Sequence, residues 1–138
     1  MAIRFGQDIG VMILSYRSLA LWVLGYPEAA LADTERALMD AREISHAGTL
    51  MYALFHVSLP HIWCGNYATA NAIVDELVAL ADEKGSPFWK AIGMVPQGCL
   101  LALAGKALDA VRVSRMLPRC RRGGYTPEPS RRAVFGCR

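Results

Sequence analysis

The sequence predicts an all-α protein, built as a right-handed solenoid of about three antiparallel helical hairpins with a 40-residue period. A glycine that suits a tight turn and, five residues later, an alanine recur at this spacing. The positions are Gly25, Gly65 and Gly105 for the glycine, and Ala30, Ala70 and Ala110 for the alanine. Between them, apolar residues recur every three or four positions, which is the spacing of one helix face. A recurrence of this length is typical of a repeated supersecondary unit.

The composition fits one globular domain. The chain has 138 residues, of which 54% are hydrophobic and 20% are charged, enough for a core and ordinary for this class. The cysteines Cys64, Cys99, Cys120 and Cys137 show neither a CxxC motif nor metal-ligand spacing. We therefore expect reduced thiols in a cytoplasmic protein, with Cys64 and Cys99 buried in helices.

The first helix is predicted from Asp8 to about Leu24. The Asp8 carboxylate can cap it by accepting a hydrogen bond from a free N–H of the first turn. The stretch is mostly apolar, so a signal peptide is an alternative. Arg17 interrupts the stretch, however, and no convincing small-residue cleavage site precedes Gly25. We therefore favour a buried helix over a targeting segment.

The second helix is predicted over about residues 27–44. Gly25 can adopt the left-handed conformation that ends a helix. Pro27 suits the first turn of the next helix, where its missing N–H costs nothing. Glu28 and Asp33 are expected to face solvent, and the expected buried stripe consists of Ala30, Leu31, Ala37, Leu38 and Ala41.

The other predicted helices are residues 49–64, 67–83, 87–104 and about 106–117. Pro60 removes one backbone hydrogen bond near the end of the third helix. Ser86 is the expected cap of the fifth helix, which also contains Gly93, Pro96 and Gly98. These three residues predict that the fifth helix is the most bent and the least stable.

The chain divides into a repeat domain, residues 1–118, and a basic, irregular tail, residues 119–138, because helical periodicity ends at Pro118. Residues 1–111 carry seven Lys or Arg and eleven Asp or Glu, whereas residues 112–138 carry eight Arg and one Glu. The composition of the tail is typical of a solvated segment. It is also what translation of the gene in an altered reading frame would produce. Binding of a nucleic acid by the tail is less favoured. Any basic segment attracts phosphate groups, and no aromatic interleaving or fold motif typical of a nucleic-acid-binding protein supports this function.

The repeat resembles the tetratricopeptide family of helical hairpins over about residues 8–117. That family has a small residue in the middle of the first helix, a glycine in the internal turn and an alanine early in the second helix. The matching positions are Ser18, Ser58 and Gly98 for the small residue, Gly25, Gly65 and Gly105 for the glycine, and Ala30, Ala70 and Ala110 for the alanine. The period is 40 residues instead of about 34, and the usual tryptophan and closing proline are missing, which favours an elongated, divergent version.

The run from Leu24 to Leu31, Leu-Gly-Tyr-Pro-Glu-Ala-Ala-Leu, is similar to repeats at the C-terminal end of large bacterial regulators. Those regulators join a nucleotide cyclase or an ATPase to a helical array. The resemblance implies an alternative function, a ligand-sensing repeat fragment of such a regulator. The sequence contains no segment of a cyclase domain or of an ATPase domain.

No motif predicts catalysis. The sequence has no glycine-rich phosphate loop, and His56 and His61 are five residues apart, which does not place both on one helix face. Acidic neighbours such as Asp75 and Glu76 are expected on a solvated face and not as an acid–base pair. We therefore expect no enzymatic activity, no cofactor and no metal.

The remaining candidate is a surface. The first helices of stacked hairpins line a concave groove, and exposed aromatic residues dominate binding hot spots. The predicted function is a non-catalytic scaffold or regulatory module that binds a peptide or helix in this groove, with burial of the aromatics in the core as the alternative. The groove candidates are Tyr16, Trp22, Tyr52, Phe55, His56 and Trp63.

The ends of the array predict self-association. Leu103, Leu108, Val111 and Met116 would be partly uncovered without a capping helix, and monomers rarely expose large apolar patches. A two-fold contact is the simplest cover, so the expected partners are a protein or peptide and a second copy of the chain. Nucleic acid and membrane are not expected.

Overall fold

The computed structural model describes residues 6–116, and 85% of them are helical, with no strand among them. This confirms the predicted all-α class. The predicted tail, residues 119–138, lies outside the described residues. The helices of the described part are α1 (Ile9–Val23), α2 (Pro27–Ile44), α3 (Ala47–Trp63), α4 (Tyr67–Glu83), α5 (Pro87–Leu103) and α6 (Ala107–Met116).

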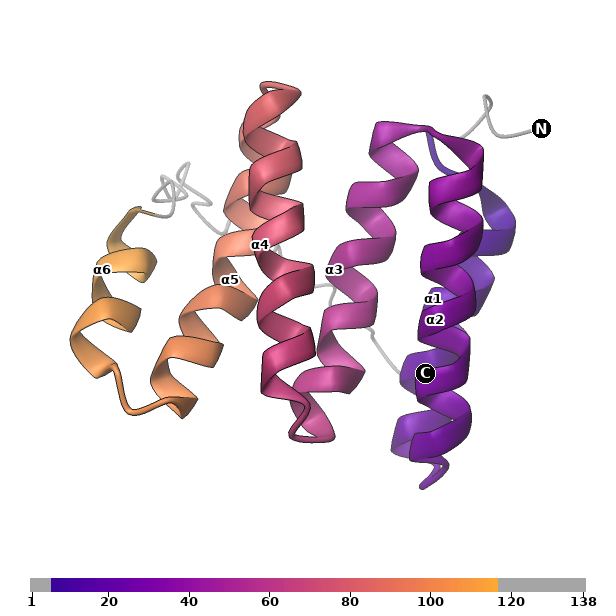
Figure 1. The fold of residues 1–138 in the computed structure, drawn as a ribbon, viewed down its shortest axis with the longest axis horizontal. Helices are drawn as coiled ribbons and strands as arrows, with labels where there is room; N and C mark the ends of the chain where they lie inside the picture. The colour runs from indigo at the N-terminus through magenta and orange to yellow at the C-terminus, as the bar shows by residue number, and fades with distance from the viewer. Residues whose placement is uncertain (1–5, 117–138) are drawn as a thin grey trace, which may run out of the picture.

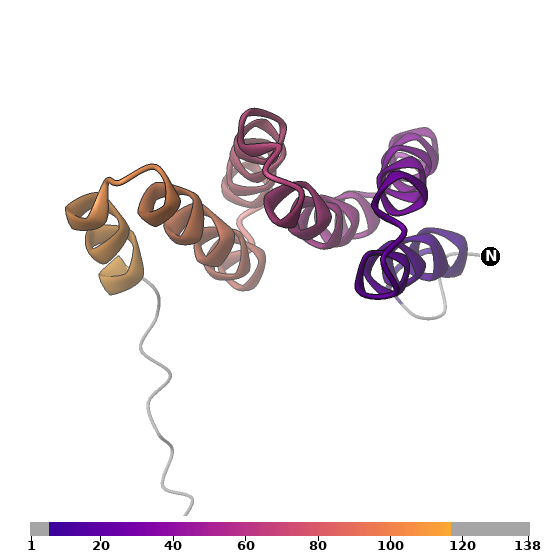
Figure 2. The ribbon, with the colours of Figure 1, turned by 90° about the horizontal axis from the view of Figure 1, so that it is seen from below.

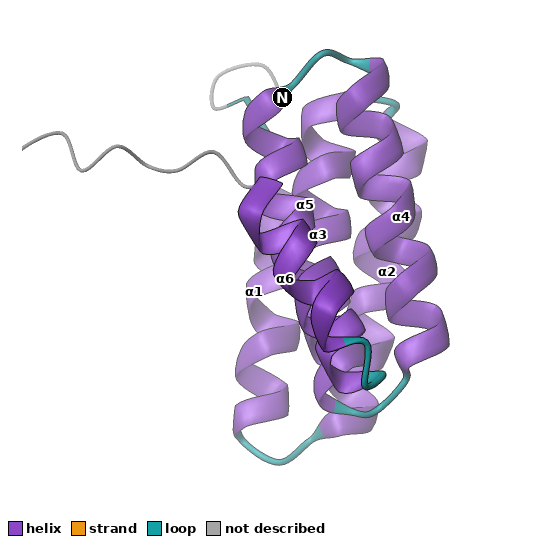
Figure 3. Ribbon diagram, turned by 90° about the vertical axis from the view of Figure 1, so that its left-hand side faces the viewer, coloured by secondary structure: helices purple, strands orange, loops and turns teal. Residues whose placement is uncertain are grey.

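Consecutive helices lie side by side and run in alternating directions (Figure 1). The contacts join α1 to α2, α3 to α4 and α5 to α6, and they also join α2 to α3 and α4 to α5. In Figure 2, α2 and α4 lie along one side of the molecule, and α1, α3 and α5 lie along the other. Short loops connect the helices at both ends (Figure 3). The layer of α1, α3 and α5 is held together by direct contacts of α1 and α5 with α3.

Glycines close the predicted turns. Gly25, Gly65 and Gly105 have φ angles of 87°, 78° and 76°, in the left-handed region that a side chain disfavours. Each stands just beyond the end of α1, α3 or α5, as the sequence predicts. Two other turns use Ser45, with φ of 56°, and Gly85, with φ of 61°.

Side chains cap the N-terminal ends of α1 and α3, whereas α2, α4 and α5 begin without a side-chain capping hydrogen bond. The carboxylate of Asp8 accepts a hydrogen bond from the N–H of Val11 at 3.1 Å, which confirms the predicted cap of α1. Helix α3 begins two residues earlier than predicted, because the Nδ1 atom of His46 accepts a hydrogen bond from the N–H of Thr49 at 3.2 Å. Ser86 occupies the cap position of α5, as predicted, but its side chain makes no capping hydrogen bond.

The main core lies between α3, α4 and α2, and partly buried side chains of α1 and α5 pack against it. Burying this apolar surface is the principal source of stability. Its buried members are Ala37, Met51, Leu54, Val57, Ile73, Leu77 and Ala81.

The small residue and the alanine of each predicted repeat are fully buried in the first two helix pairs and less buried in the third, whereas the turn glycines Gly25, Gly65 and Gly105 are exposed. Helix α6, the last helix that the structure describes, packs mainly against α5 and has no buried residue. The relative exposure is 0% for Ser18, Ala30, Ser58 and Ala70, whereas Gly98 and Ala110 are partly exposed.

The expectation that Asp33 faces solvent is wrong. Asp33 is only 8% exposed, and its two carboxylate oxygens accept hydrogen bonds from Nε and Nη2 of Arg17, both at 2.6 Å. A paired, bidentate arginine offsets the cost of removing a carboxylate from water. The ion pair thereby joins α1 to α2.

Candidate functional site

Aromatic side chains from three helices meet on the side of the molecule formed by α1, α3 and α5. The rings of Tyr52 and His56 stack with their centroids 4.1 Å apart. Tyr16 of α1 packs edge-on against both of them, at 6.3 Å and 5.3 Å. Trp89 of α5 packs edge-on against Tyr52 at 6.4 Å. The cluster therefore unites segments that are far apart in the sequence.

Two phenylalanines extend the cluster. The ring of Phe55 lies 5.1 Å from that of His56, and the ring of Phe88 lies 5.4 Å from that of Trp89. Tyr52 reaches His56 because residues four apart share one helix face. The six residues that we call the aromatic face are Tyr16, Tyr52, Phe55, His56, Phe88 and Trp89.

The aromatic face is open at its two ends and closed at its centre. Tyr16 is 57% exposed and Phe88 is 65% exposed, whereas Tyr52 is 6% exposed. Phe55, His56 and Trp89 are half-buried. A partner can therefore contact Tyr16 and Phe88 directly, while the buried Tyr52 packs against Tyr16 and Trp89.

Burial keeps Tyr52 and His56 uncharged at neutral pH. His56 donates a hydrogen bond from Nδ1 to the carbonyl oxygen of Tyr52 at 2.9 Å, which leaves Nε2 as an acceptor. Burial lowers the pKa of His56, and the hydrogen bond to Tyr52 opposes this shift. Burial and, to a smaller extent, the neighbouring Tyr16 raise the pKa of Tyr52. Within residues 6–116 the buried Tyr52 hydroxyl makes no hydrogen bond of good geometry.

Two of the predicted groove residues lie apart from the aromatic face. The rings of Trp22 and Trp63 pack on each other, with centroids 4.7 Å apart and planes tilted by 43°. They stand at the C-terminal ends of α1 and α3, and Trp63 is 42% exposed. The predicted groove is therefore divided into two aromatic groups.

Phe88 and Trp89 are the members of the aromatic face that the sequence did not indicate. They follow Pro87 in the first turn of α5. Phe88 lies four residues before Ile92, so the three-to-four spacing of a helix face was a signal that could have identified it. Trp89, three residues before Ile92, carries the same signal, but its contact with Tyr52 depends on how α5 packs on α3.

A shallow apolar hollow lies beside α1. It has a volume of about 650 Å³. Tyr16 contributes both to this hollow and to the aromatic face. The lining residues are Gln7, Ile9, Met12, Ile13 and Tyr16.

Within residues 6–116, no three His, Cys, Asp or Glu side chains are placed to hold a metal ion. No helix in the same range has both the length and the apolar character needed to cross a bilayer. Cys64 is partly exposed and Cys99 is exposed, so the expectation that both are buried is wrong.

Comparisons with protein-family models, with curated proteins and with solved structures find no match to this chain.

Proposed function

We propose that this chain is a non-catalytic binding module that takes a peptide or helix of a partner protein on the aromatic face. The observation that carries the proposal is a continuous aromatic cluster across α1, α3 and α5, with Tyr16 and Phe88 exposed at its ends. Aromatic side chains supply large contact areas at a low cost in conformational entropy, and they dominate interface hot spots.

The proposal includes a tetratricopeptide-like solenoid with a 40-residue period. The starts of α2, α4 and α6, at residues 27, 67 and 107, support this period. The shared left-handed φ of Gly25, Gly65 and Gly105 supports it as well. In such an array the first helix of each hairpin lines the inner side. Here those helices are α1, α3 and α5, which carry the aromatic face.

The chemistry of the face defines the partner. The face contains no charged side chain, so a hydrophobic peptide fits it better than a nucleotide or another highly charged ligand. An amphipathic helix would present apolar anchors at three- and four-residue spacing. Tyr16 and Phe88 would contact the outer anchors, and the half-buried Phe55 and Trp89 would contact the central one. The reduced thiols of Cys64 and Cys99 fit action in the cytoplasm.

Selection from a random-peptide phage library against the full chain tests this function. The best recovered peptide is synthesised with a fluorophore, and its affinity is measured by anisotropy. We expect peptides rich in large apolar residues with micromolar dissociation constants. Tyr16→Ala and Phe88→Ala should each weaken binding by about thirtyfold, which corresponds to the threshold of about 2 kcal/mol for a hot spot.

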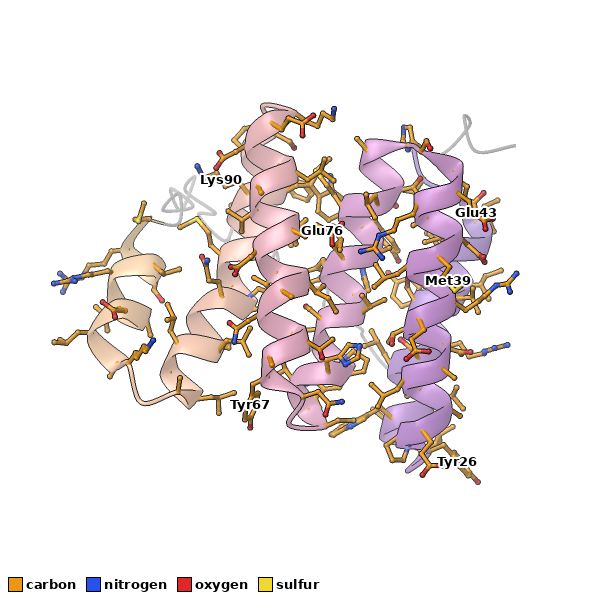
Figure 4. The ribbon with its side chains drawn as sticks, in the orientation of Figure 1. Tyr26, Met39, Glu43, Tyr67, Glu76 and Lys90 are labelled. Atoms are coloured by element: carbon orange, nitrogen blue, oxygen red, sulfur yellow. The ribbon has the colours of Figure 1, made fainter. Side chains whose placement is uncertain are left out.

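Tyr26→Ala is the matched control. Tyr26 is 60% exposed, close to the value for Tyr16, but it stands at the turn between α1 and α2 (Figure 4). Its replacement should leave the affinity unchanged. The proposal fails if no peptide is enriched, or if Tyr26→Ala weakens binding as much as the two aromatic-face variants do.

A further inference from the structure

We propose that the outward face of α1 is a self-association surface, on which a second copy of this chain packs its own α1 in the antiparallel direction. This face carries apolar residues at three- and four-residue spacing along the whole helix. We call it the α1 stripe. Four of its members are strongly exposed: Ile9 at 51%, Ile13 at 58%, Tyr16 at 57% and Val23 at 74%. The members of the α1 stripe are Ile9, Met12, Ile13, Tyr16, Ala20 and Val23.

The α3 positions that correspond to Ile9 and Ile13 are covered, whereas Trp63, which corresponds to Val23, is 42% exposed. In the 40-residue spacing of the proposed repeat, Thr49 and Ala53 correspond to Ile9 and Ile13, and both are 0% exposed. This comparison rests on the repeat in the proposed function. It identifies the α1 stripe as the kind of surface that another helix covers elsewhere in the same molecule.

The cover on α3 is supplied by the α1–α2 pair. Ala53 packs with Val11 of α1 and Ala41 of α2. The side-chain oxygen of Thr49 accepts a hydrogen bond from the N–H of Asp8 at 3.1 Å. At the corresponding positions α1 carries two isoleucines. Its stripe is therefore larger and more apolar than the surface of α3 that packs against the α1–α2 pair.

The exposed area of the stripe suits a dimer. The exposed fractions of its side chains form an apolar patch of a few hundred Å², the size that monomers often use for binding. Two copies would together bury somewhat less than about 1,000 Å², which is the range of weak or transient interfaces and fits a micromolar dimer.

A second copy fits this stripe because the stripe is self-complementary. The charged residue of α1 is Arg17, and its guanidinium is held by Asp33 of α2. Two stripes therefore meet without opposing like charges. With a two-fold axis at Tyr16, Ile9 lies near Val23 of the second copy, and Met12 lies near Ala20 of the second copy, so the whole stripe is covered.

Two further features favour this arrangement. Antiparallel helices place opposite ends of their dipoles together, which is favourable. The hollow of about 650 Å³ borders Ile9, Met12, Ile13 and Tyr16, so it offers space for side chains of the second copy. The Phe88 end of the aromatic face stays free in such a dimer, and Tyr16 joins the two faces.

Sedimentation velocity of the full chain from about 1 to about 100 µM, the range of a micromolar affinity, tests the proposal. We expect a dimer whose dissociation constant rises at least tenfold in Ile13→Asp, because the substitution buries an unpaired carboxylate within the contact. Leu108→Asp is the matched control. Leu108 is 77% exposed on α6, so its replacement should leave the dimer intact.

Hydroxyl-radical footprinting of the unmodified chain gives an independent reading that does not depend on a variant folding. Raising the concentration should protect Met12 and Tyr16 from oxidation. Met39, 55% exposed on α2, and Tyr26, 60% exposed at the turn, should be oxidised equally at both concentrations. The same two residues can be located in Figure 4.

Three results would overturn the proposal: a monomer at the highest concentration, a dimer that persists in Ile13→Asp, or a dimer that Leu108→Asp dissociates. In the last case the C-terminal end is the contact. If the unmodified chain is a monomer that nevertheless binds a different apolar helix through the α1 stripe, the second copy is also excluded. Neither experiment measures peptide binding at Phe88, so the failure of the dimer and the failure of the proposed function are separable.

Discussion

Arg17 and Asp33 illustrate how single residues fix the packing of α1 on α2. Asp33 is nearly buried, yet both of its oxygens are satisfied by one guanidinium at 2.6 Å. This pairing could not be predicted from the sequence, because Asp33 by its residue type belongs to a solvated face and its partner lies in another helix.

Arg17→Gln should therefore lower the free energy of unfolding by about 1–3 kcal/mol, the cost of leaving a buried polar group without its partner. The control is Arg36→Gln. Arg36 pairs with Asp40 on the surface of α2, with side-chain exposures of 66% and 28%, and such a pair contributes about 0.5 kcal/mol or less. Urea unfolding measures both variants, and equal effects would show that the Arg17 pair has no special role.

His61 is the second residue whose surroundings decide its chemistry. Its Nε2 lies 3.4 Å from the side-chain oxygen of Thr34, and the Thr34 hydroxyl itself donates to the carbonyl of Leu31 at 2.6 Å. Nε2 must therefore carry the hydrogen. The buried Nδ1 has no hydrogen-bond partner among residues 6–116. Burial lowers the pKa of His61, and the charge of Glu35 opposes this shift.

The lowered pKa predicts a loss of stability in acid. As the pH falls through about 6.5, the ordinary histidine value, the unfolded chain binds a proton that the folded chain does not. The loss continues until the pH passes below the folded pKa, and the lowered pKa of His56 adds to it in the same direction. Urea unfolding at pH 7.5 and 5.5 should show a smaller difference for His61→Gln than for the unmodified chain. An identical difference would contradict this account.

At the scale of the helices, the close crossings depend on small side chains. Ala30 and Ala70 are 0% exposed where α2 and α4 pack against their neighbours. The recurring alanines and glycines predicted the helices and their turns because these signals are local. They did not reveal the earlier start of α3, which depends on the His46 imidazole.

Ala30→Leu and Ala70→Leu should each destabilise the protein by about 1–3 kcal/mol, because a packed crossing has no room for extra methylenes. Ala79→Leu is the matched control, since Ala79 is exposed on α4. Thermal unfolding followed by circular dichroism compares the three variants. Equal melting temperatures would mean that the crossings are not tight.

At the scale of the whole molecule, burial decreases toward the C-terminal end of the described part. Within residues 6–116 the buried apolar residues end at Leu100, and no residue of α6 is buried. Exposed apolar side chains on α6, such as Leu108 at 77%, fit the expectation of an uncovered end. The local spacing of residues could predict this gradient only in part, because burial depends on which helices flank each pair.

The aromatic face was also predictable only in part. Tyr16, Tyr52, Phe55 and His56 are brought together as expected. Trp22 and Trp63 form a separate pair, because residues six or seven positions farther along a helix lie about 10 Å away along its axis. The contribution of α5 depends on how α5 packs on α3, which no local pattern specifies.

The central claim is that a partner peptide binds along α1, α3 and α5. The most direct test is an amide chemical-shift titration of the isotope-labelled chain with the peptide recovered by selection. The account predicts that the largest shifts fall on residues around Tyr16, His56 and Phe88, with small shifts on the outer faces of α2 and α4. Shifts concentrated on α2 and α4, or spread evenly over all the helices, would contradict it.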